Sequence, residues 1–411
     1  MPTNTNVTYY PEQAINDAVQ QFETPFFLYE ENRLIENCNY FRDTFRRYFP
    51  DFEPLFAVKA NPNPTLLKLI QDQEFGFDCS SESESWIVNR LQGFGMYTGN
   101  YTTERDLAMA KNAGLILNLD DISLIPILEK IGVPEVLSFR VNPGITKGGF
   151  ASLEVAGPNA KFGIPMEQAI DAYKKAKSLG VQHFGMHIMA GSNVLDENHF
   201  VQLIDEIFPL IAEIKEELGI EIEFLNIGGG FGVPYQPEEQ DLDLEKMVRD
   251  IRESYDKNCI LYNLSGPRLM AEPGRFISAN AGWLVSKVIG IKDAHKKFVG
   301  IDATTTMMPR TAIYDAYHHI SVINNQKRSE DVSIVGRLCE NNDFFAHDRN
   351  LPKINIDDLV VIHNCGGHAS AMASNYNGFI RPAEYLLKVN GDFEMIRRAE
   401  TVEDLYSRSD L

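Results

Sequence analysis

A single lysine at the end of an apolar run offers the first chemistry in this sequence. Lys59 ends the β-type run near 55–59, and Pro62 and Pro64 force a turn before the next helical pattern. A lysine held against an apolar wall has its ammonium form disfavoured, so more of it is the free amine that can form a Schiff base. A lone lysine at such a place is more often a surface residue that caps a strand. The residues at the other strand ends must decide between these interpretations.

Charged and polar side chains end three further β-type runs. Asp78 in the second run could orient the lysine, although a helix-cap role fits its spacing equally well. Arg140 in the fifth run needs an acidic or phenolic partner and could form a structural salt bridge. His187 and Met189 in the sixth run project to the same face, and Ser192 follows in a turn that could donate to a phosphate. A lone histidine on a strand is more often a core residue.

Glycines and a carboxylate end the last two runs. Gly228, Gly229 and Gly230 follow the seventh run, and three successive glycines let backbone N–H groups close on an anion. A glycine run can also be only a tight turn. Glu272 and Arg275 end the eighth run, where they could pair with each other. They could instead face a ligand with a protonatable ring nitrogen and an anionic group.

The elements that must position these residues alternate between β and α patterns. Amphipathic helical patterns lie between most strands, for example at 65–70, 84–91 and 166–173. Eight strands over about 220 residues are typical of a closed (β/α)8 barrel, whereas an open sheet usually has fewer. We therefore predict an α/β fold with a TIM-like barrel over residues 30–276, whose strand ends share one catalytic face. The apolar β-type runs lie near 55–59, 75–80, 95–99, 115–119, 136–142, 184–190, 224–228 and 268–272.

A second, mostly β domain is expected to follow the barrel. Short β-type runs replace the alternation after residue 276, and helical patterns become scarce. We predict that residues 1–29 and 277–411 form this domain, with the N-terminal strand at 24–29 joining it.

Composition limits the classes of partner. The formal net charge of -20 argues against nucleic acid and anionic membrane surfaces. The five cysteines are scattered without CxxC spacing, which fits a reducing compartment. The N-terminus lacks the regions of a signal peptide, and no run approaches the length of a membrane span. We expect a cytoplasmic protein that acts on a small molecule, with no membrane partner.

The strand ends together supply the parts that pyridoxal 5′-phosphate needs: a Schiff-base lysine, an anion cradle and a carboxylate for the ring nitrogen. The chain resembles the fold type III pyridoxal-phosphate-dependent decarboxylases, the ornithine and diaminopimelate decarboxylase family, and diaminopimelate decarboxylases most. The resemblance covers nearly the whole chain and implies an alanine-racemase-like architecture. The matching motifs are FAVKANPNP at 56–64, GFDCSSESE at 76–84, NIGGGFG at 226–232 and AEPGR at 271–275.

Two C-terminal motifs extend the resemblance. Residues 338–343 resemble the family's cysteine motif, and residues 374–384 resemble its tail. In the family this cysteine is offered across a dimer interface to the other subunit's cofactor. The resemblance therefore implies an obligate homodimer with shared active sites. A buried structural cysteine is the alternative for Cys339, although its polar neighbours argue against it.

The resemblance also implies roles for individual residues. Lys59 holds the cofactor as a Schiff base, Glu272 keeps the ring nitrogen protonated, and Cys339 reprotonates Cα directly or through a group that it orients. The other implied cofactor contacts are Asp78, Arg140, His187, Met189, Ser192, Gly228, Gly229, Gly230, Gly274, Arg275, His368 and Tyr376.

Two residues depart from the family pattern. Met189 stands where the family usually has a histidine that stacks on the pyridine ring, so either Met189 or His187 packs against the ring. His368 stands where an aromatic hydroxyl is expected to reach the phosphate, and a histidine can also donate to phosphate.

One segment favours diaminopimelate as the substrate over ornithine, since diaminopimelate carries a second carboxylate. Residues 310–318 resemble the substrate segment of diaminopimelate decarboxylases and supply Arg310 and Tyr314. Arg275 could also bind the distal carboxylate, because an arginine fork matches a carboxylate. Glu340 would meet the distal ammonium, and Asp343 is a further candidate for substrate binding.

Three other functions remain open. The same scaffold serves decarboxylases of other amino acids in polyamine, siderophore and antibiotic pathways. An amino-acid racemase prefers a less electron-withdrawing ring, which Glu272 argues against. A catalytically inactive relative that binds a partner protein would be expected to lack Lys59 or Cys339, and both are present.

Overall fold

The computed structural model describes residues 7–145, 147–148, 155–324 and 326–410. The chain divides into two compact units. The barrel unit consists of Cys38–Val233 and Asp241–Phe276, and the β unit of Met1–Asn37, Pro234–Gln240 and Ile277–Leu411.

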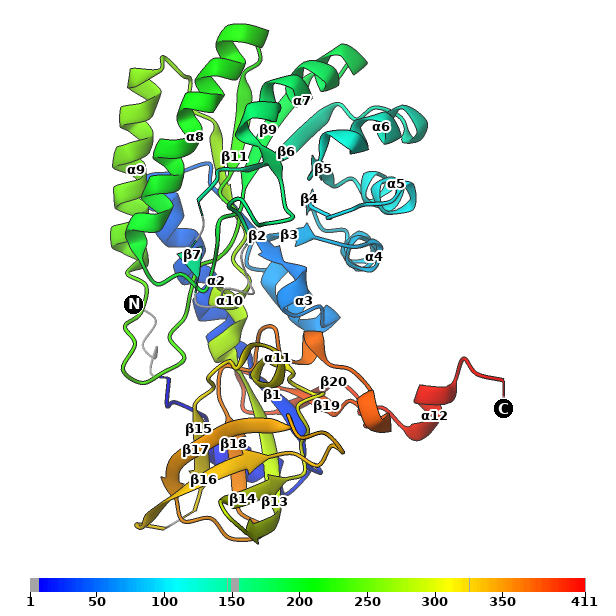
Figure 1. Cartoon of the computed structure of the whole chain (residues 1–411), viewed down its shortest axis with the longest axis vertical. Coiled ribbons are helices and arrows are strands. Elements are labelled where there is room, and N and C mark those ends of the chain that lie inside the picture. Colours follow the sequence, from blue (N-terminus) through cyan, green and yellow to red (C-terminus); the bar gives the residue numbers. More distant parts are fainter. Residues whose placement is uncertain (1–6, 146, 149–154, 325, 411) are drawn as a thin grey trace. The chain divides into compact units, whose positions relative to one another are not determined.

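Eight parallel strands close into a barrel in the barrel unit (Figure 1). Each strand pairs with the next, and the last pairs with the first. Every predicted run overlaps one of these strands, so the TIM-like barrel is confirmed. The strands are β2 (Glu53–Ala57), β3 (Gly76–Cys79), β4 (Gly95–Tyr97), β5 (Ile116–Leu119), β6 (Val136–Asn142), β9 (His183–Ile188), β11 (Ile222–Asn226) and β12 (Arg268–Ala271).

Helices alternate with the barrel strands, and several begin where the sequence offers a side-chain cap. The Asn63 side chain accepts a hydrogen bond from the Thr65 N–H at the start of α3, with Pro64 as its first residue. Ser81 and Thr103 cap the next two helices in the same way. The helices are α2 (Glu31–Tyr48), α3 (Pro64–Gln71), α4 (Glu82–Arg90), α5 (Glu104–Asn112), α6 (Ile125–Ile131), α7 (Met166–Leu179), α8 (Glu197–Leu218) and α9 (Leu244–Leu261).

The β unit is built on one sheet, which confirms the predicted mostly β second domain. The N-terminal strand β1 (Phe26–Glu30) joins it, antiparallel to β13 (Gly282–Asp293) and parallel to β19 (Ala383–Leu387). Short helices accompany the sheet, namely α1 (Glu12–Ala18), α11 (Arg310–Tyr314) and α12 (Val402–Tyr406), while α10 (Arg275–Ser278) follows β12. The remaining strands are β14 (Lys297–Ile301), β15 (Ile320–Ile323), β16 (Ser329–Val335), β17 (Phe344–Pro352), β18 (Leu359–Ile362) and β20 (Phe393–Arg397).

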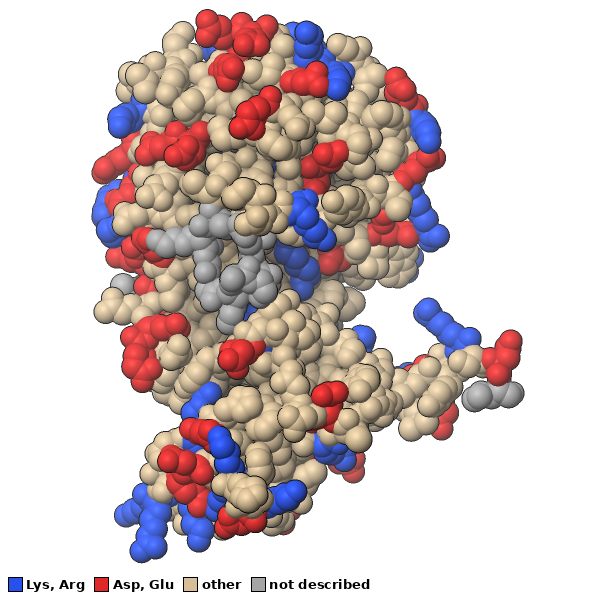
Figure 2. Space-filling model, in the orientation of Figure 1, with Lys and Arg blue, Asp and Glu red and all other residues tan. Residues whose placement is uncertain are grey.

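The charge distribution on the surface and the length of the helices bear on the sequence-based expectations about partners. Acidic and basic side chains are interspersed over the face shown in Figure 2. Among the described residues, no helix is both long enough and apolar enough to cross a bilayer.

Candidate functional site

Lys59 lies just beyond the carboxyl end of the first barrel strand. β2 ends at Ala57, and a 3-10 turn at Val58–Ala60 carries the lysine. Its side chain is 48% exposed, and its Nζ lies 3.6 Å from Asp78 Oδ2. The expectation of an apolar wall is therefore wrong, because a carboxyl group faces the ammonium. Gly274 packs closely against this turn, because a Cβ on Gly274 would lie only 3.0 Å from the Ala60 Cβ.

Asp78 is a buried carboxyl group on β3, only 1% exposed. Burial, followed by the nearby Glu272 carboxylate, raises the pKa of Asp78 to about 8. At neutral pH most of this group is therefore protonated.

Glu272 is a further buried carboxyl group of the barrel and follows β12. Its Oε1 accepts a hydrogen bond from Asn226 Nδ2 at 2.7 Å and lies 3.1 Å from His187 Nε2. Burial alone would raise the pKa of Glu272, but His187 and two nearby cations outweigh it and hold the pKa below its usual value. The barrel thus pairs a charged carboxylate with a protonated one, a pattern typical of sites that divide acid and base roles.

Arg140 is buried on β6 and has the acidic partner that it needs. Its Nη1 lies 3.8 Å from Asp120 Oδ1, and its Nη2 donates to the Val155 carbonyl oxygen at 3.1 Å. The guanidinium also lies 4.6 Å from the Phe162 ring centroid. Burial lowers the pKa of Arg140, and Asp120 is the largest opposing influence. These contacts match the salt-bridge alternative for this residue.

The glycine turn after β11 fits tightly against its neighbours. A Cβ on Gly228, where φ is +68°, would lie 2.4 Å from the Ile188 carbonyl oxygen. A Cβ on Gly229 would lie 2.6 Å from the Glu272 carbonyl oxygen, and one on Gly230 would lie 2.7 Å from that of Gly191. Only glycine permits this approach of the backbone to the ends of the adjacent strands.

Two N–H groups of this turn bond to the protein itself. The Gly228 N–H donates to Asn226 Oδ1 at 2.9 Å, and the Gly229 N–H donates to Met189 Sδ at 3.0 Å. A phosphate at this turn would use the Gly230 N–H or displace these bonds. Ser192 is half-buried in the short strand β10 (Gly191–Ser192). The preceding residue, Gly191, is the one whose carbonyl oxygen faces Gly230.

The cysteine motif and the tail meet within the β unit. Cys339 is exposed, which excludes the buried structural cysteine, and its N–H donates to Asn377 Oδ1 at 2.8 Å. The neighbouring Tyr376 is 53% exposed, and Glu340 is also exposed.

Asp343 is buried in the same motif, and protein donors occupy its carboxylate. Oδ1 accepts from both the N–H and the hydroxyl of Thr305 at 2.8 Å, and Oδ2 accepts from the Leu338 N–H at 2.7 Å. These bonds hold the loop that carries Cys339, which indicates a positioning role rather than a direct contact with substrate.

The remaining candidates also belong to the β unit, except Arg275. Arg310 is the first residue of α11, and its Nε donates to His318 Nε2 at 3.3 Å. Tyr314 ends the same helix and is half-buried. His368 is half-buried with a positive φ of 57°. Arg275 is buried at the start of α10.

Sequence reasoning missed three partners of these residues. Asp120 follows β5, and its place at a strand end was a signal that could have revealed it. Asn226 opens the NIGGGFG motif, and His318 closes the segment at 310–318. The contact between Asn226 and Glu272 could not be predicted, because these residues lie 46 positions apart in the chain.

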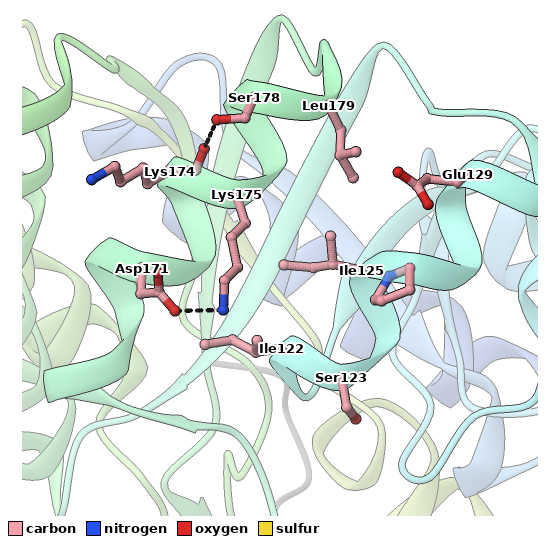
Figure 3. Close-up of a pocket in the computed structure, with 10 residues that line it drawn as sticks. Ile122, Ser123, Ile125, Glu129, Asp171, Lys174, Lys175, Ser178 and Leu179 are labelled. Atoms are coloured by element: carbon pink, nitrogen blue, oxygen red, sulfur yellow. Dashed lines mark hydrogen bonds and ion pairs between the residues drawn. The ribbon is translucent and has the colours of Figure 1, made fainter.

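A groove on the outside of the barrel unit lacks this chemistry. It has a volume of about 540 Å³ between the α6 and α7 regions, with an ion pair between Asp171 and Lys175 at 2.7 Å (Figure 3). None of the predicted site residues lines it. Its lining is formed by Ile122, Ser123, Ile125, Pro126, Glu129, Asp171, Lys174, Lys175, Ser178 and Leu179.

The barrel residues fit pyridoxal 5′-phosphate. Lys59 supplies an amine for its aldehyde, and Glu272 supplies a charged carboxylate of the kind that binds a protonated ring nitrogen. The turn at Gly228 to Gly230 brings backbone without side chains into the same barrel, where a phosphate would use the Gly230 N–H or displace the two bonds made by Gly228 and Gly229.

Comparison with known proteins identifies the family. Residues 33–279 match the model described as "Pyridoxal-dependent decarboxylase, pyridoxal binding domain". The diaminopimelate decarboxylase of Methanothermobacter thermautotrophicus is 34% identical over 95% of this chain and 93% of its own. Protein TabA of Pseudomonas amygdali pv. tabaci is 36% identical over 95% and 92%. The structure of diaminopimelate decarboxylase from M. jannaschii in co-complex with L-lysine is 31% identical, covers 97% of this chain and 94% of that one, and has a TM-score of 0.87. The chain therefore belongs to the pyridoxal-dependent decarboxylase family.

Proposed function

We propose that the chain decarboxylates meso-diaminopimelate to L-lysine with pyridoxal 5′-phosphate. One observation supports the reaction: the Lys59 amine, the protonated Asp78 and the charged Glu272 gather at the strand ends of one barrel. The substrate is supported by full-length similarity to several diaminopimelate decarboxylases, at 30 to 34% identity. The M. jannaschii enzyme in co-complex with L-lysine agrees with lysine as the product.

The proposed mechanism assigns a proton or a bond to each residue. Bound pyridoxal 5′-phosphate supplies an electron sink for the pair left on Cα when the carboxylate departs as CO₂. Lys59 would hold the cofactor through its side-chain amine. Glu272, fixed by Asn226 and His187, keeps the ring nitrogen protonated. Cys339, or a group that it orients, then delivers a proton to Cα.

We propose residues 30–276 as the cofactor-binding domain. His187 or Met189 packs on the pyridine ring of the cofactor. Arg140 stabilises the strand ends around it through its ion pair with Asp120. The phosphate contacts are proposed to come from Ser192 and the turn at Gly228 to Gly230, with His368 as a further donor. Gly274, Arg275 and Tyr376 are proposed as further cofactor contacts.

The proposed β-rich domain, residues 1–29 and 277–411, recognises the distal end of the substrate. Arg310 and Tyr314 bind the distal carboxylate, with Arg275 as a further cation. Glu340 binds the distal ammonium. Asp343 acts through the loop, because protein donors already occupy its oxygens.

We further propose a cytoplasmic homodimer in which each subunit offers Cys339 to the cofactor of the other. Cys339, Glu340 and Tyr376 are all exposed on the β unit, as a residue that serves a partner must be. All five cysteines are free thiols, which suits a reducing compartment.

The test is CO₂ release by the cofactor-loaded protein from meso-diaminopimelate, lysine, ornithine and arginine at equal concentration. We expect release from diaminopimelate alone. Cys339→Ala should abolish it, and Arg310→Ala should raise KM by about a hundredfold with a smaller effect on kcat. Release from another amino acid only would keep the reaction and reject this substrate.

A decarboxylase of another amino acid is the second candidate. Protein TabA, at 36% identity, is not named a diaminopimelate decarboxylase. Met189, which stands where the family usually has a histidine, bonds to the glycine turn here. If CO₂ is released from none of the four amino acids while cofactor is bound, this second candidate is supported.

A further inference from the structure

Two aromatic side chains of the β unit hold Arg310. The arginine is only 3% exposed, and its Nε donates to His318 Nε2 at 3.3 Å. Its guanidinium carbon also lies 5.2 Å from the centroid of the Tyr235 ring. Contacts with a histidine and a tyrosine fix the side chain without using its charge in an ion pair with either of them.

The bond from Arg310 determines the tautomer of His318. A guanidinium N–H can only donate, so His318 Nε2 must carry a lone pair and the imidazole must be neutral. The ring proton then lies on Nδ1, which donates to the His363 carbonyl oxygen at 2.7 Å. His318 is fully buried. A backbone carbonyl therefore orients the imidazole, and the imidazole orients the guanidinium.

The next residue in the chain reinforces this arrangement. Asn364 Nδ2 donates to the Pro234 carbonyl oxygen at 2.9 Å and so fixes the segment that carries Tyr235. The Tyr235 ring meets the His318 ring edge-on, with centroids 5.0 Å apart and planes at 76°. Residues 363 and 364 thus anchor both aromatic neighbours of Arg310.

We propose that His318 is a positioning residue that makes the site specific for substrates with a distal carboxylate. The proposal rests on the proposed function, in which Arg310 binds that carboxylate. The bond from Nε to His318 fixes the direction in which the guanidinium points, and a guanidinium offers a carboxylate charge-assisted hydrogen bonds. An arginine that is already oriented loses less side-chain freedom when the ligand binds.

Two ligands separate this role from a structural one. Loss of the reacting carboxylate turns diaminopimelate into L-lysine, which keeps the distal carboxylate, whereas cadaverine lacks both carboxylates. The dissociation constants of the holoenzyme for both ligands are measured for the wild type, His318→Phe and His318→Gln. His319→Phe is the matched control, because His319 is the adjacent histidine and packs on the His363 ring at 4.9 Å.

We expect His318→Phe to weaken L-lysine binding about tenfold, since the guanidinium loses a hydrogen bond to a fixed partner. Cadaverine binding should not change. KM for meso-diaminopimelate should rise about tenfold while kcat stays close to the wild-type value. His318→Gln keeps an acceptor oxygen and should retain most of the affinity for L-lysine. His319→Phe should behave as the wild type.

Wild-type affinity for L-lysine in folded His318→Phe would overturn the proposal, as would an equal loss of L-lysine and cadaverine. If His318→Phe does not fold, His318→Gln decides: an equal loss of both ligands, or a fall in kcat with KM unchanged, rejects the positioning role. Failure of the proposed function looks different, because the wild type itself would then neither bind L-lysine nor release CO₂ from meso-diaminopimelate.

Discussion

The most informative residues are two buried carboxyl groups with opposite protonation. Asp78 has its pKa raised by burial and by Glu272, whereas Glu272 has its pKa lowered by His187 and nearby cations despite its own burial. A charged group in a buried site requires such partners, and Asn226 adds a hydrogen bond. The charge needed beside a pyridine nitrogen is therefore already in place in the protein.

Replacing Asp78 tests its protonation through the pH dependence of stability. The pKa rises from 3.8 to about 8 on folding, so the folded protein binds more protons between these values. The free energy of unfolding should fall as pH rises through that window. Asp78→Asn removes this slope, so its stability relative to the wild type should increase from about pH 4 to about pH 8. Urea unfolding of the cofactor-free wild type and Asp78→Asn at several pH values measures this difference in the free energy of unfolding.

The exposed carboxylate Asp171 offers the control for this experiment, since Asp171→Asn changes charge outside the barrel interior. An identical pH slope in both variants would show that Asp78 is ionised in the folded protein. That result would contradict the assignment of a protonated Asp78 beside a charged Glu272.

The sequence could identify candidate residues but not all of their surroundings. Lys59, Asp78 and Glu272 were predictable because strand ends of a barrel share one face. The exposure of Lys59 was not, because it depends on which side chain faces it across neighbouring strands. The role of Asp343 was not predictable either. An aspartate in this motif suggests a contact with a ligand, whereas in the structure its carboxylate accepts hydrogen bonds from Thr305.

Among the elements, the turn between β11 and α9 carries a strict steric requirement. Its glycines face the carbonyl oxygens of Ile188, Glu272 and Gly191. The sequence predicted a glycine turn at this place. It could not predict that Met189 accepts one of the N–H groups, because the two residues are 40 positions apart.

Gly228→Ala and Gly219→Ala separate the cost of a positive φ from the cost of a steric clash between the added Cβ and its neighbours. Both glycines have positive φ, at +68° and +59°, but only a Cβ on Gly228 meets a neighbouring atom within 4 Å. Gly219→Ala should cost about 1 to 2 kcal/mol for its backbone conformation alone. Gly228→Ala should cost more, because the end of β9 must move. It should also weaken cofactor binding, which Gly219→Ala should leave unchanged.

Urea unfolding and cofactor titration of the two variants provide the measurements. Equal destabilisation with equal cofactor affinity would show that the turn tolerates a side chain. The close approach to Ile188 would then have no functional consequence.

For the whole molecule, sequence periodicity predicted the architecture more fully than the organisation of the units. The eight runs mapped onto eight barrel strands because recognisable helical patterns lie between most of them. The β unit also takes in Pro234–Gln240, which lies between barrel elements in the chain. No local pattern marks such an insertion, although Tyr235 within it contacts Arg310.

The proposal of shared active sites makes a prediction about mixed dimers. Lys59→Ala and Cys339→Ala should each be inactive as homodimers. If each cofactor takes its cysteine from the partner, a dimer of one variant with the other holds one intact site and one doubly altered site. We therefore expect purified mixed dimers, made by co-expression with two affinity tags, to show about half of the wild-type kcat.

The reciprocal pairing supplies the control for that experiment. A chain with both Lys59→Ala and Cys339→Ala, combined with a wild-type chain, leaves one alteration in each shared site and should be inactive. Sites formed within one chain give the opposite result: the first pairing would be inactive, and the second would keep about half of the activity. The two pairings contain the same substitutions in the same numbers, so stability effects cancel between them. The distribution of activity therefore reports only on which chain supplies Cys339 to the cofactor held by Lys59.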